Sequence, residues 1–221
     1  MKIVLPGILQ PITINSNSLS TVVIENPDLL YNILLDLKTQ VFGGSGQSVL
    51  SQENVPVSFS KYAEVLDGFA PFELNRKSLL TKVMGALEHK CQDTDNYMRG
   101  NQLLGEIETY MEDLSFDLPC VLSYQKLNWN SLIKAAGLYI ESETTLLAEQ
   151  IIEYMDLVSN LENEKLFILV NLRSFVDDKS LELFASTCMQ HGFHVLMIDS
   201  VAKDLLTLER RLTIDYDLCE F

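Results

Sequence analysis

The pattern of apolar and polar positions divides the chain into stretches that are typical of different secondary structures. Up to residue 25, short apolar runs alternate with turn residues such as Pro6 and Gly7, which indicates two or three short antiparallel strands. Asn26 and Pro27 then supply a helix cap and a proline at the first helical position. Because leucine, isoleucine and valine recur at helical spacing as far as residue 41, we expect an amphipathic helix there.

A helical stretch follows a polar connector at residues 43–60, which is rich in Gly, Ser and Gln. Apolar side chains repeat at helical spacing over residues 79–87, with Asn75 as the candidate cap, and again over residues 103–114. Because a polar stretch at residues 92–100 separates the two helices, the pattern predicts an antiparallel helix pair.

The last third has the pattern of a β-α-β unit. Residues 166–170 form an unbroken apolar run, which is typical of a strand covered on both faces. A helix capped near Asp177 follows, and a second apolar run covers residues 195–198. Two parallel strands joined by a helical crossover are therefore expected, with a further strand at residues 213–218.

Taken together, these elements predict the α/β class. We expect a head with a mixed or parallel sheet, into which a helical leg subdomain is inserted. The changes of pattern place the first part of the head at residues 1–60, the helical leg at residues 61–139 and the second part of the head at residues 140–221.

Composition and charge narrow the class of protein further. The chain has 221 residues, of which 47% are apolar, so it can bury a sizeable core. No apolar run approaches the ~20 residues of a membrane helix, and the four cysteines form no Cys-x-x-Cys motif. We expect a soluble cytoplasmic protein with no membrane partner. The excess of 31 acids over 16 bases gives a net charge of −15, which at first sight argues against an anionic partner such as DNA.

Two segments have the outline of a nucleotide site but lack its chemistry. The glycine-rich residues 43–48 follow a predicted helix rather than a strand, and Gln47 stands where a phosphate loop needs lysine. Asn171 ends the apolar run at the position where a magnesium-binding acid would be required, and it is neutral. The spacing indicates no catalytic constellation, so we expect no enzyme activity and no bound nucleotide.

The bases are concentrated in one part of the chain. Residues 76–99 contain five bases and three acids, a net charge of +2, whereas the rest of the chain has 11 bases and 28 acids, a net charge of −17. The five bases are Arg76, Lys77, Lys82, Lys90 and Arg99. This stretch is a candidate for contacts with phosphates. The alternative is the solvated face of an amphipathic helix.

Acids are concentrated in the stretch that follows. Residues 106–164 contain twelve acids and only two bases, Lys126 and Lys134. Clustered carboxylates suit calcium, which takes several oxygen ligands in flexible geometry, although no EF-hand spacing is present. A solvated acidic surface is the other interpretation.

Four segments resemble a known family across essentially the whole chain. They are residues 8–12 followed by 23–26, residues 66–80, residues 132–141 and residues 165–171. Their order and spacing resemble the ring-forming CRISPR-associated protein of type II-A systems, the accessory protein of spacer acquisition. None of the four segments is a catalytic signature.

The resemblance implies a fold and a function. The fold would be an α/β head with a degenerate nucleotidase-like sheet and an inserted helical leg. Relatives of this kind form homotetrameric rings without enzymatic activity, bind the ends of linear double-stranded DNA and use calcium to hold the ring's shape. They act in antiviral defence beside the integrase and the RNA-guided nuclease of the CRISPR system.

Carried to this chain, the resemblance suggests which residues face the ligands. For sequence-independent contacts with DNA we expect Arg76, Lys77, Lys82, Lys90, Arg99 and Lys134. The acid-rich stretch that supplies calcium ligands in the family corresponds to residues 122–126, which contain no carboxylate here. Asp113, Asp117 and Glu141 are the nearest candidates for metal ligands.

Two other functions fit parts of the pattern. One is a protein–protein scaffold of the adaptation complex, in which the basic stretch is merely solvated and the acidic faces bind a partner. The other is an NTP-dependent enzyme on the same α/β core, for which a Gly-Lys-Ser/Thr motif after a strand would be required and is absent.

Overall fold

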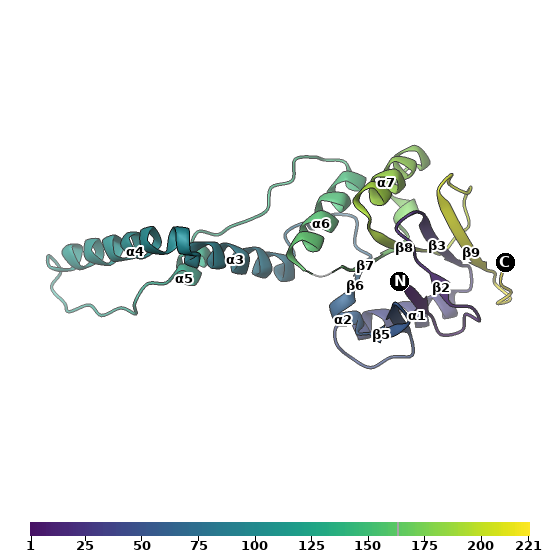
Figure 1. Ribbon diagram of the computed structural model, residues 1–221, viewed down its shortest axis with the longest axis horizontal. Coiled ribbons are helices and arrows are strands. Elements are labelled where there is room, and N and C mark those ends of the chain that lie inside the picture. Colours follow the sequence, from purple (N-terminus) through teal and green to yellow (C-terminus); the bar gives the residue numbers. More distant parts are fainter. Residues whose placement is uncertain (163) are drawn as a thin grey trace. The chain divides into compact units, whose positions relative to one another are not determined.

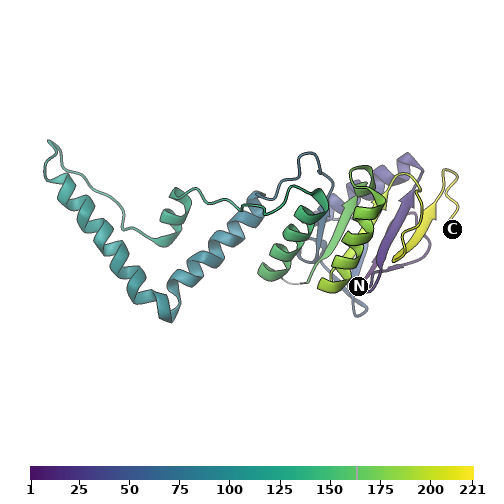
Figure 2. The same cartoon turned by 90° about the horizontal axis from the view of Figure 1, so that it is seen from above.

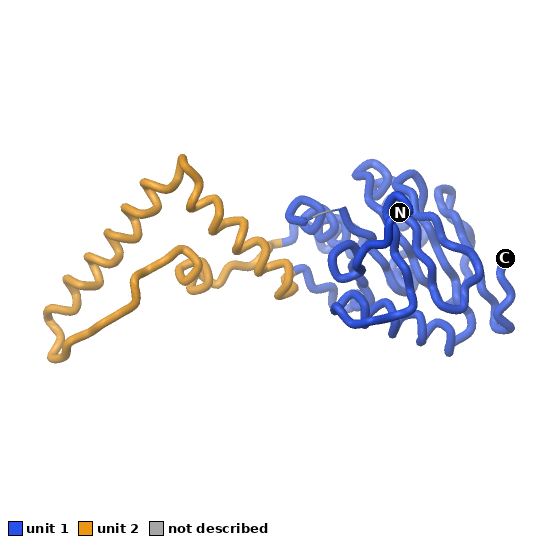
Figure 3. Tube along the Cα trace, turned by 60° about the horizontal axis from the view of Figure 1, so that its bottom comes forward, with its two compact units in different colours: residues 1–74, 142–221 blue, residues 75–141 orange. Residues whose placement is uncertain are grey.

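The computed structural model describes residues 1–162 and 164–221, which form two compact units. Unit 1 combines residues 1–74 with residues 142–221, and unit 2 is the intervening segment, residues 75–141 (Figure 3). The prediction of the α/β class is confirmed by the parallel sheet of unit 1 and the helices around it.

Unit 1 is built on a five-stranded sheet in the order β6-β7-β8-β3-β9, and every neighbouring pair is parallel (Figure 1). The strands are β3 (Leu19–Ile24), β6 (Ala63–Leu66), β7 (Leu166–Val170), β8 (His194–Asp199) and β9 (Glu209–Ile214). All residues of β3 and β7 are buried, as expected for strands that are covered on both faces. The predicted pairing of two parallel strands around a helical crossover is confirmed by β7 and β8.

The expectation of antiparallel pairing up to residue 25 is only partly right. β1 (Lys2–Val4) pairs antiparallel with β2 (Ile12–Thr13), but β3 lies between β8 and β9 and is parallel to both. A strand's direction depends on its partners, and those of β3 lie more than 170 residues away. A second, antiparallel sheet has the order β2-β1-β4-β5, with β4 at Val49–Gln52 and β5 at Val55–Val57.

Helices cover the two faces of the parallel sheet (Figure 1). On one face lies α1 (Pro27–Val41), whose Ile33 and Leu37 pack with alternate residues of β3 and β8 and with the small antiparallel sheet. On the other lie α6 (Leu147–Leu161) and α7 (Asp178–His191). A short helix, α2 (Phe59–Tyr62), precedes β6.

Two predicted helix starts, at Asn26 and Asp177, are confirmed by capping hydrogen bonds. The Asn26 side chain accepts from the Leu29 amide at 3.0 Å, and Pro27 occupies the first turn of α1. The Asp177 carboxylate accepts from the amide of Ser180 at 3.0 Å. Caps of this kind are set by a few neighbouring residues, which is why the sequence alone locates them.

Unit 2 consists of three helices, α3 (Lys77–Gln92), α4 (Thr94–Ser115) and α5 (Trp129–Ala135). The prediction of an antiparallel pair is wrong: only Asp93 separates α3 from α4, and the two helices form an open V (Figure 2). Most of the polar stretch at residues 92–100, which was expected to form a loop, belongs to the first turns of α4. In the described part of the chain, no helix is both long and apolar enough to cross a bilayer.

The division into units differs from the boundaries expected after residues 60 and 139. β6 pairs with β7 in the parallel sheet, so the chain leaves unit 1 only after residue 74. Two hydrogen bonds link the start of unit 2 to its end. Asn75 Oδ1 accepts from the Ile140 amide at 2.6 Å, and Asn75 Nδ2 donates to the Ile140 carbonyl at 2.9 Å. Asn75 therefore joins the two ends of the insertion rather than capping α3, whose N-cap is Arg76.

The glycine-rich segment after α1 is folded around a carboxylate of the chain itself. Asp36 accepts from the amides of Gln47 at 2.6 Å and Ser48 at 2.9 Å, and also from the Gln40 side chain at 3.0 Å. Burial on its own would raise the pKa of Asp36, but these hydrogen bonds lower it below the usual value. The amides that a phosphate would need are thus already bound to an internal anion.

Replacing the Asp36 carboxylate should destabilise the protein, because it holds the connector after α1 in place. Asp36→Asn removes a charged acceptor of two amides, so we expect a loss of about 1–3 kcal/mol in the free energy of unfolding at pH 7. Because the folded-state pKa is depressed, the wild-type advantage is present above pH ~4 and is lost as the pH falls through the folded-state value. Urea denaturation of both proteins at pH 7 and pH 3.5 measures this difference.

The control is Asp217→Asn, at an exposed carboxylate in unit 1. It should change stability by less than about 0.5 kcal/mol. Equal stability of wild type and Asp36→Asn at pH 7 would contradict the assigned role of Asp36.

Candidate nucleic-acid interface

Charge is distributed unequally between the two units. Unit 1 contains nine bases and 22 acids, a net charge of −13, whereas unit 2 contains seven bases and nine acids, a net charge of −2. Within unit 2, the bases concentrate in α3 and the first turns of α4, and five acids follow in residues 106–117. An anionic ligand therefore meets the least repulsion at the α3 end of unit 2.

Several bases of unit 1 are already held by carboxylates. The ion pairs are Lys38–Asp67, Lys165–Glu162, Arg173–Glu209 and Arg211–Glu209. Lys165 and Arg173 are also buried. These side chains stabilise unit 1 and offer little positive surface to a ligand.

All six residues predicted to contact DNA lie in unit 2. Arg76 is the N-cap of α3, Lys77, Lys82 and Lys90 lie along that helix, Arg99 lies near the start of α4, and Lys134 lies in the last turn of α5. Lys77, Lys90, Arg99 and Lys134 are exposed, and Arg76 and Lys82 are partly buried.

The structure does not bring all six onto one face. At about 100° per residue, Lys82 and Lys90 lie about 80° apart around the axis of α3, whereas Lys77 lies about 140° from each of them. The three lysines therefore flank α3 on two sides, with only Lys82 and Lys90 close to a common face.

Lys90 and Arg99 do come together, because α3 and α4 meet at Asp93. Both line a shallow hollow of about 300 Å³, whose apolar wall includes Leu87, Leu103 and the indole of Trp129 from α5. Gly100 makes this arrangement possible: a Cβ atom there would lie 3.0 Å from Trp129 Nε1 and 3.3 Å from the Cys91 carbonyl. We call this site the elbow hollow.

The elbow hollow combines two chemical features that suit nucleic acid. Lys90 and Arg99 can each bind a phosphate, and the partly buried Trp129 lines the same hollow and supplies an aromatic ring, the kind of side chain on which unpaired or terminal bases stack. Lys90 also lies in the last turn of α3, where the helix dipole stabilises a positive charge, so its position has an explanation that needs no ligand. This explanation does not apply to Arg99, which lies in the second turn of α4.

Trp129 is the member of this site that the sequence analysis did not identify. It is the one tryptophan of the chain, and it directly follows Asn128, whose side chain caps α5. Its rarity was a signal, but only the fold shows that it lies against Gly100, on a different helix.

The start of α3 carries two bases where a helix usually favours acids. Arg76 and Lys77 lie at the positive end of the helix dipole, and the first turn contains no acid and no side-chain cap. For Lys77, in that first turn, a nearby phosphate would be favourable to the helix, which is a second, weaker feature that fits a phosphate ligand at unit 2.

The carboxylates predicted as metal ligands are not gathered in one place. Asp113 lies in the last turn of α4 and Asp117 just beyond it, whereas Glu141 follows Ile140, which lies beside Asn75 at the start of α3. Over residues 1–162 and 164–221, no group of three or more His, Cys, Asp or Glu side chains could hold a metal ion. The residues of a single chain therefore do not fit the expected calcium site.

The strand ends that resemble a nucleotidase are used for structure. Asn171, after β7, has a left-handed conformation (φ 56°), and its Oδ1 accepts from the Ser200 amide at 2.8 Å. The Asn171 side chain thereby ties the end of β7 to the loop after β8. A neutral amide that is already bound in this way is a poor metal anchor.

A buried ionic cluster lies beside these strand ends. Arg173 contacts Glu209 at 3.4 Å and donates to the Asp204 carbonyl at 2.6 Å. Asp199, at the end of β8, is only 3% exposed, and both of its carboxylate oxygens lack a hydrogen-bond partner among the described residues. Burial raises the pKa of Asp199 to about 6, although Arg173 opposes the shift.

Comparison with known proteins gives matches of two kinds, to a family model and to solved structures. The model of the family described as CRISPR-associated protein (Cas_Csn2) matches residues 40–218. The crystal structure of Stu0660 of Streptococcus thermophilus matches with a TM-score of 0.58 and 14% identity, over 97% of this chain and 75% of that one. At this identity, the structural match shows the fold alone. No curated protein matches.

The elbow hollow generates a prediction for two glycines of α4. Gly105 faces open space and Gly100 does not, so Gly105→Ala should stabilise the helix by about 0.5–1 kcal/mol whereas Gly100→Ala should push Trp129 away. Because Trp129 is the only tryptophan, its fluorescence reports this change directly. We expect a red-shifted emission maximum for Gly100→Ala and an unchanged maximum for Gly105→Ala. Identical spectra for both variants would exclude the packing described.

The buried cluster generates a prediction about pH. Because the folded-state pKa of Asp199 lies above the unfolded value of 3.8, the wild type loses stability as the pH rises towards and past 6. Asp199→Asn removes this loss, so at pH 8 it should be more stable by about 2–3 kcal/mol. Thermal unfolding at pH 8 and pH 4 should show a gain at the higher pH only. A variant that is less stable at both pH values would contradict the pKa assignment.

Proposed function

The chain belongs to the Cas_Csn2 family of CRISPR-associated proteins, and from this premise we propose that it binds the ends of linear double-stranded DNA during CRISPR spacer acquisition. The proposed binding is independent of base sequence and non-enzymatic. The observation that carries the proposal is the convergence in the elbow hollow of Trp129 with Lys90 and Arg99, which belong to the net-positive stretch of an acidic chain.

Phosphate contacts account for the affinity in this proposal. Lys and Arg side chains that neutralise phosphates release counterions, so log K falls with log salt concentration by about 0.9 per phosphate contact. Such contacts carry no information about base sequence. Lys77, Lys82, Lys134 and Arg76 extend the phosphate-binding surface of unit 2 beyond the elbow hollow.

Trp129 supplies the preference for ends. Inside a continuous duplex the base faces are stacked on one another, whereas the terminal pair exposes one face. An indole beside two cations can stack on that face while Lys90 and Arg99 hold the nearby phosphates. A covalently closed circle has no terminal pair and should bind more weakly.

Assembly of four chains into a ring is the second part of the proposal. α4 has an exposed apolar stripe whose side chains are 38–56% exposed: Leu103, Ile107, Met111 and Leu114. Apolar surface at helical spacing favours burial against another copy of the chain. The acidic unit 1 of each copy would repel DNA, so the ring would accept DNA only along the net-positive residues 76–99 of unit 2.

A non-enzymatic role is favoured by the two segments that resemble a nucleotide site. The connector after α1 binds its own Asp36, and Asn171 is neutral and engaged with Ser200. The proposed mechanism therefore contains no nucleotide and no step that depends on calcium. The integrase and the RNA-guided nuclease of the system are the proposed protein partners.

Charge reversal tests the proposed interface. The double variant Lys90→Glu/Arg99→Glu should lose at least tenfold in affinity for a linear duplex at 100 mM salt, because two phosphate contacts become repulsive. Fluorescence anisotropy of an end-labelled duplex measures the affinity, and covalently closed circular DNA of the same sequence serves as competitor. Binding of the linear duplex should also quench Trp129.

The matched control reverses two exposed lysines of unit 1, Lys61 and Lys179, and changes the net charge by the same amount. It should reduce affinity less than threefold. Equal losses in the two double variants would indicate a response to total charge only. No binding at low salt would favour the scaffold alternative, and ATP turnover above blank would favour the enzyme.

A further inference from the structure

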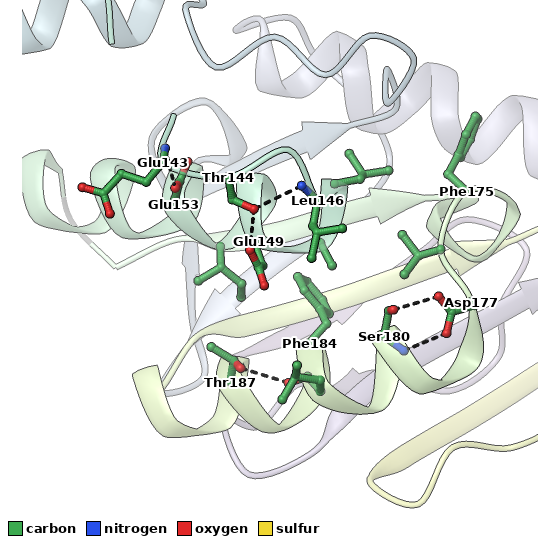
Figure 4. Close-up of a pocket in the computed structure, with 15 residues that line it drawn as sticks. Glu143, Thr144, Leu146, Glu149, Glu153, Phe175, Asp177, Ser180, Phe184 and Thr187 are labelled. Atoms are coloured by element: carbon green, nitrogen blue, oxygen red, sulfur yellow. Dashed lines mark hydrogen bonds between the residues drawn. The ribbon is translucent and has the colours of Figure 1, made fainter. Parts of the chain in front are cut away.

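Unit 1 has a hollow of about 570 Å³ between α6 and α7 that the proposed DNA binding does not use (Figure 4). The first half of α6 forms one side, α7 forms the other, and the segment around Phe175 closes one end. Figure 4 shows Phe184 rising from α7 towards the start of α6. We call this site the α6–α7 groove.

The floor and edges of the groove are apolar. Phe184 is buried at its base, and Leu147 and Ile152 of α6 are partly buried beside it. Leu146, Phe175 and Leu183 stand at the edges and are 61%, 51% and 64% exposed. Single exposed apolar residues are ordinary, but three large ones around one concave site are typical of a binding surface.

The rim of the groove is acidic. Glu143, Glu149, Glu153 and Asp177 line it, and none of the described lining residues is Lys, Arg or His. These carboxylates repel phosphates, so the groove does not suit DNA. Apolar anchors with cationic neighbours are the complementary chemistry.

Local hydrogen bonds hold the carboxylates in place. The Ser142 hydroxyl donates to Glu153 Oε2 at 2.6 Å, and the Thr144 hydroxyl donates to Glu149. Asp177 accepts from the amide and the hydroxyl of Ser180. The bond from the Ser180 amide is the main cause of a lowered pKa for Asp177.

We propose that the α6–α7 groove binds a basic amphipathic helix of a partner protein. A groove between two helices accepts the side-chain ridge of a third, with apolar residues at positions i, i+3, i+4 and i+7 against Leu146, Phe175 and Leu183. Lys and Arg on the flanks of that helix then pair with the four carboxylates. A second copy of the chain is a poor occupant, because Leu79 of its net-positive helix, α3, is already buried.

A synthetic peptide tests this surface with the full-length chain. The probe is a fluorescein-labelled helical peptide of about 16 residues, with leucine at the four anchor positions and lysine on both flanks. A second peptide has glutamate in place of every lysine. We expect the lysine peptide to bind at least tenfold more tightly than the glutamate peptide, and its affinity to fall as salt is added.

Variants locate the binding site. Leu183→Asp and the double variant Glu143→Lys/Glu149→Lys should each weaken lysine-peptide binding at least tenfold. The matched controls are Leu35→Asp, at an exposed leucine of α1, and Glu25→Lys/Asp217→Lys, at exposed acids elsewhere in unit 1. Both controls should bind as the wild type does. Duplex DNA binding should persist in Leu183→Asp, so failure of this proposal is distinguishable from failure of the DNA interface.

Three outcomes would overturn the proposal. The first is no binding of the lysine peptide at 100 μM, and the second is equal binding by Leu183→Asp and Leu35→Asp. The third is a smaller oligomer for Leu183→Asp than for the wild type in sedimentation velocity, which would assign the groove to contacts between copies of the chain.

Discussion

The structure depends on one constraint of parallel sheets: neighbouring parallel strands can be joined only by a crossover. β6 and β7 are such neighbours, so the chain must leave the end of β6 and return to the start of β7. In this protein that crossover contains α6 and the whole of unit 2. The two hydrogen bonds between Asn75 and Ile140 join the ends of the insertion. The six residues predicted to contact DNA are thus held in a separate unit, while the sheet and its covering helices remain intact.

This separation makes the proposed nucleic-acid surface compatible with an acidic protein. In unit 1 some charges have structural roles: Asp36 organises the connector after α1, and Arg173 and Glu209 pair in a buried cluster. Unit 2 has a smaller core, and its bases lie at exposed or partly buried positions. The net charge of −15 therefore describes mainly the part of the chain that DNA is proposed to avoid.

Local features of the fold were predictable from the sequence, and features that depend on distant partners were not. Asn26 and Asp177 cap their helices because the capping bond reaches only three residues along the chain. The direction of β3 depends on β8 and β9, and the role of Asn75 depends on Ile140, so neither follows from neighbouring residues. Charge counting identified Lys90 and Arg99 individually. Lys90, Arg99 and Trp129 lie together because only Asp93 separates α3 from α4 and because Gly100 leaves room for the indole. The spacing of apolar residues along the chain indicates neither feature.

The central claim is that DNA lies on unit 2 and avoids unit 1. Ultraviolet cross-linking of the chain to a linear duplex, followed by mass spectrometry of the cross-linked peptides, measures the position of DNA directly. The account predicts cross-links within residues 75–141, concentrated around Trp129, and their loss when excess linear competitor is added. Cross-links that lie mainly in unit 1, in residues 1–74 or 142–221, would contradict it.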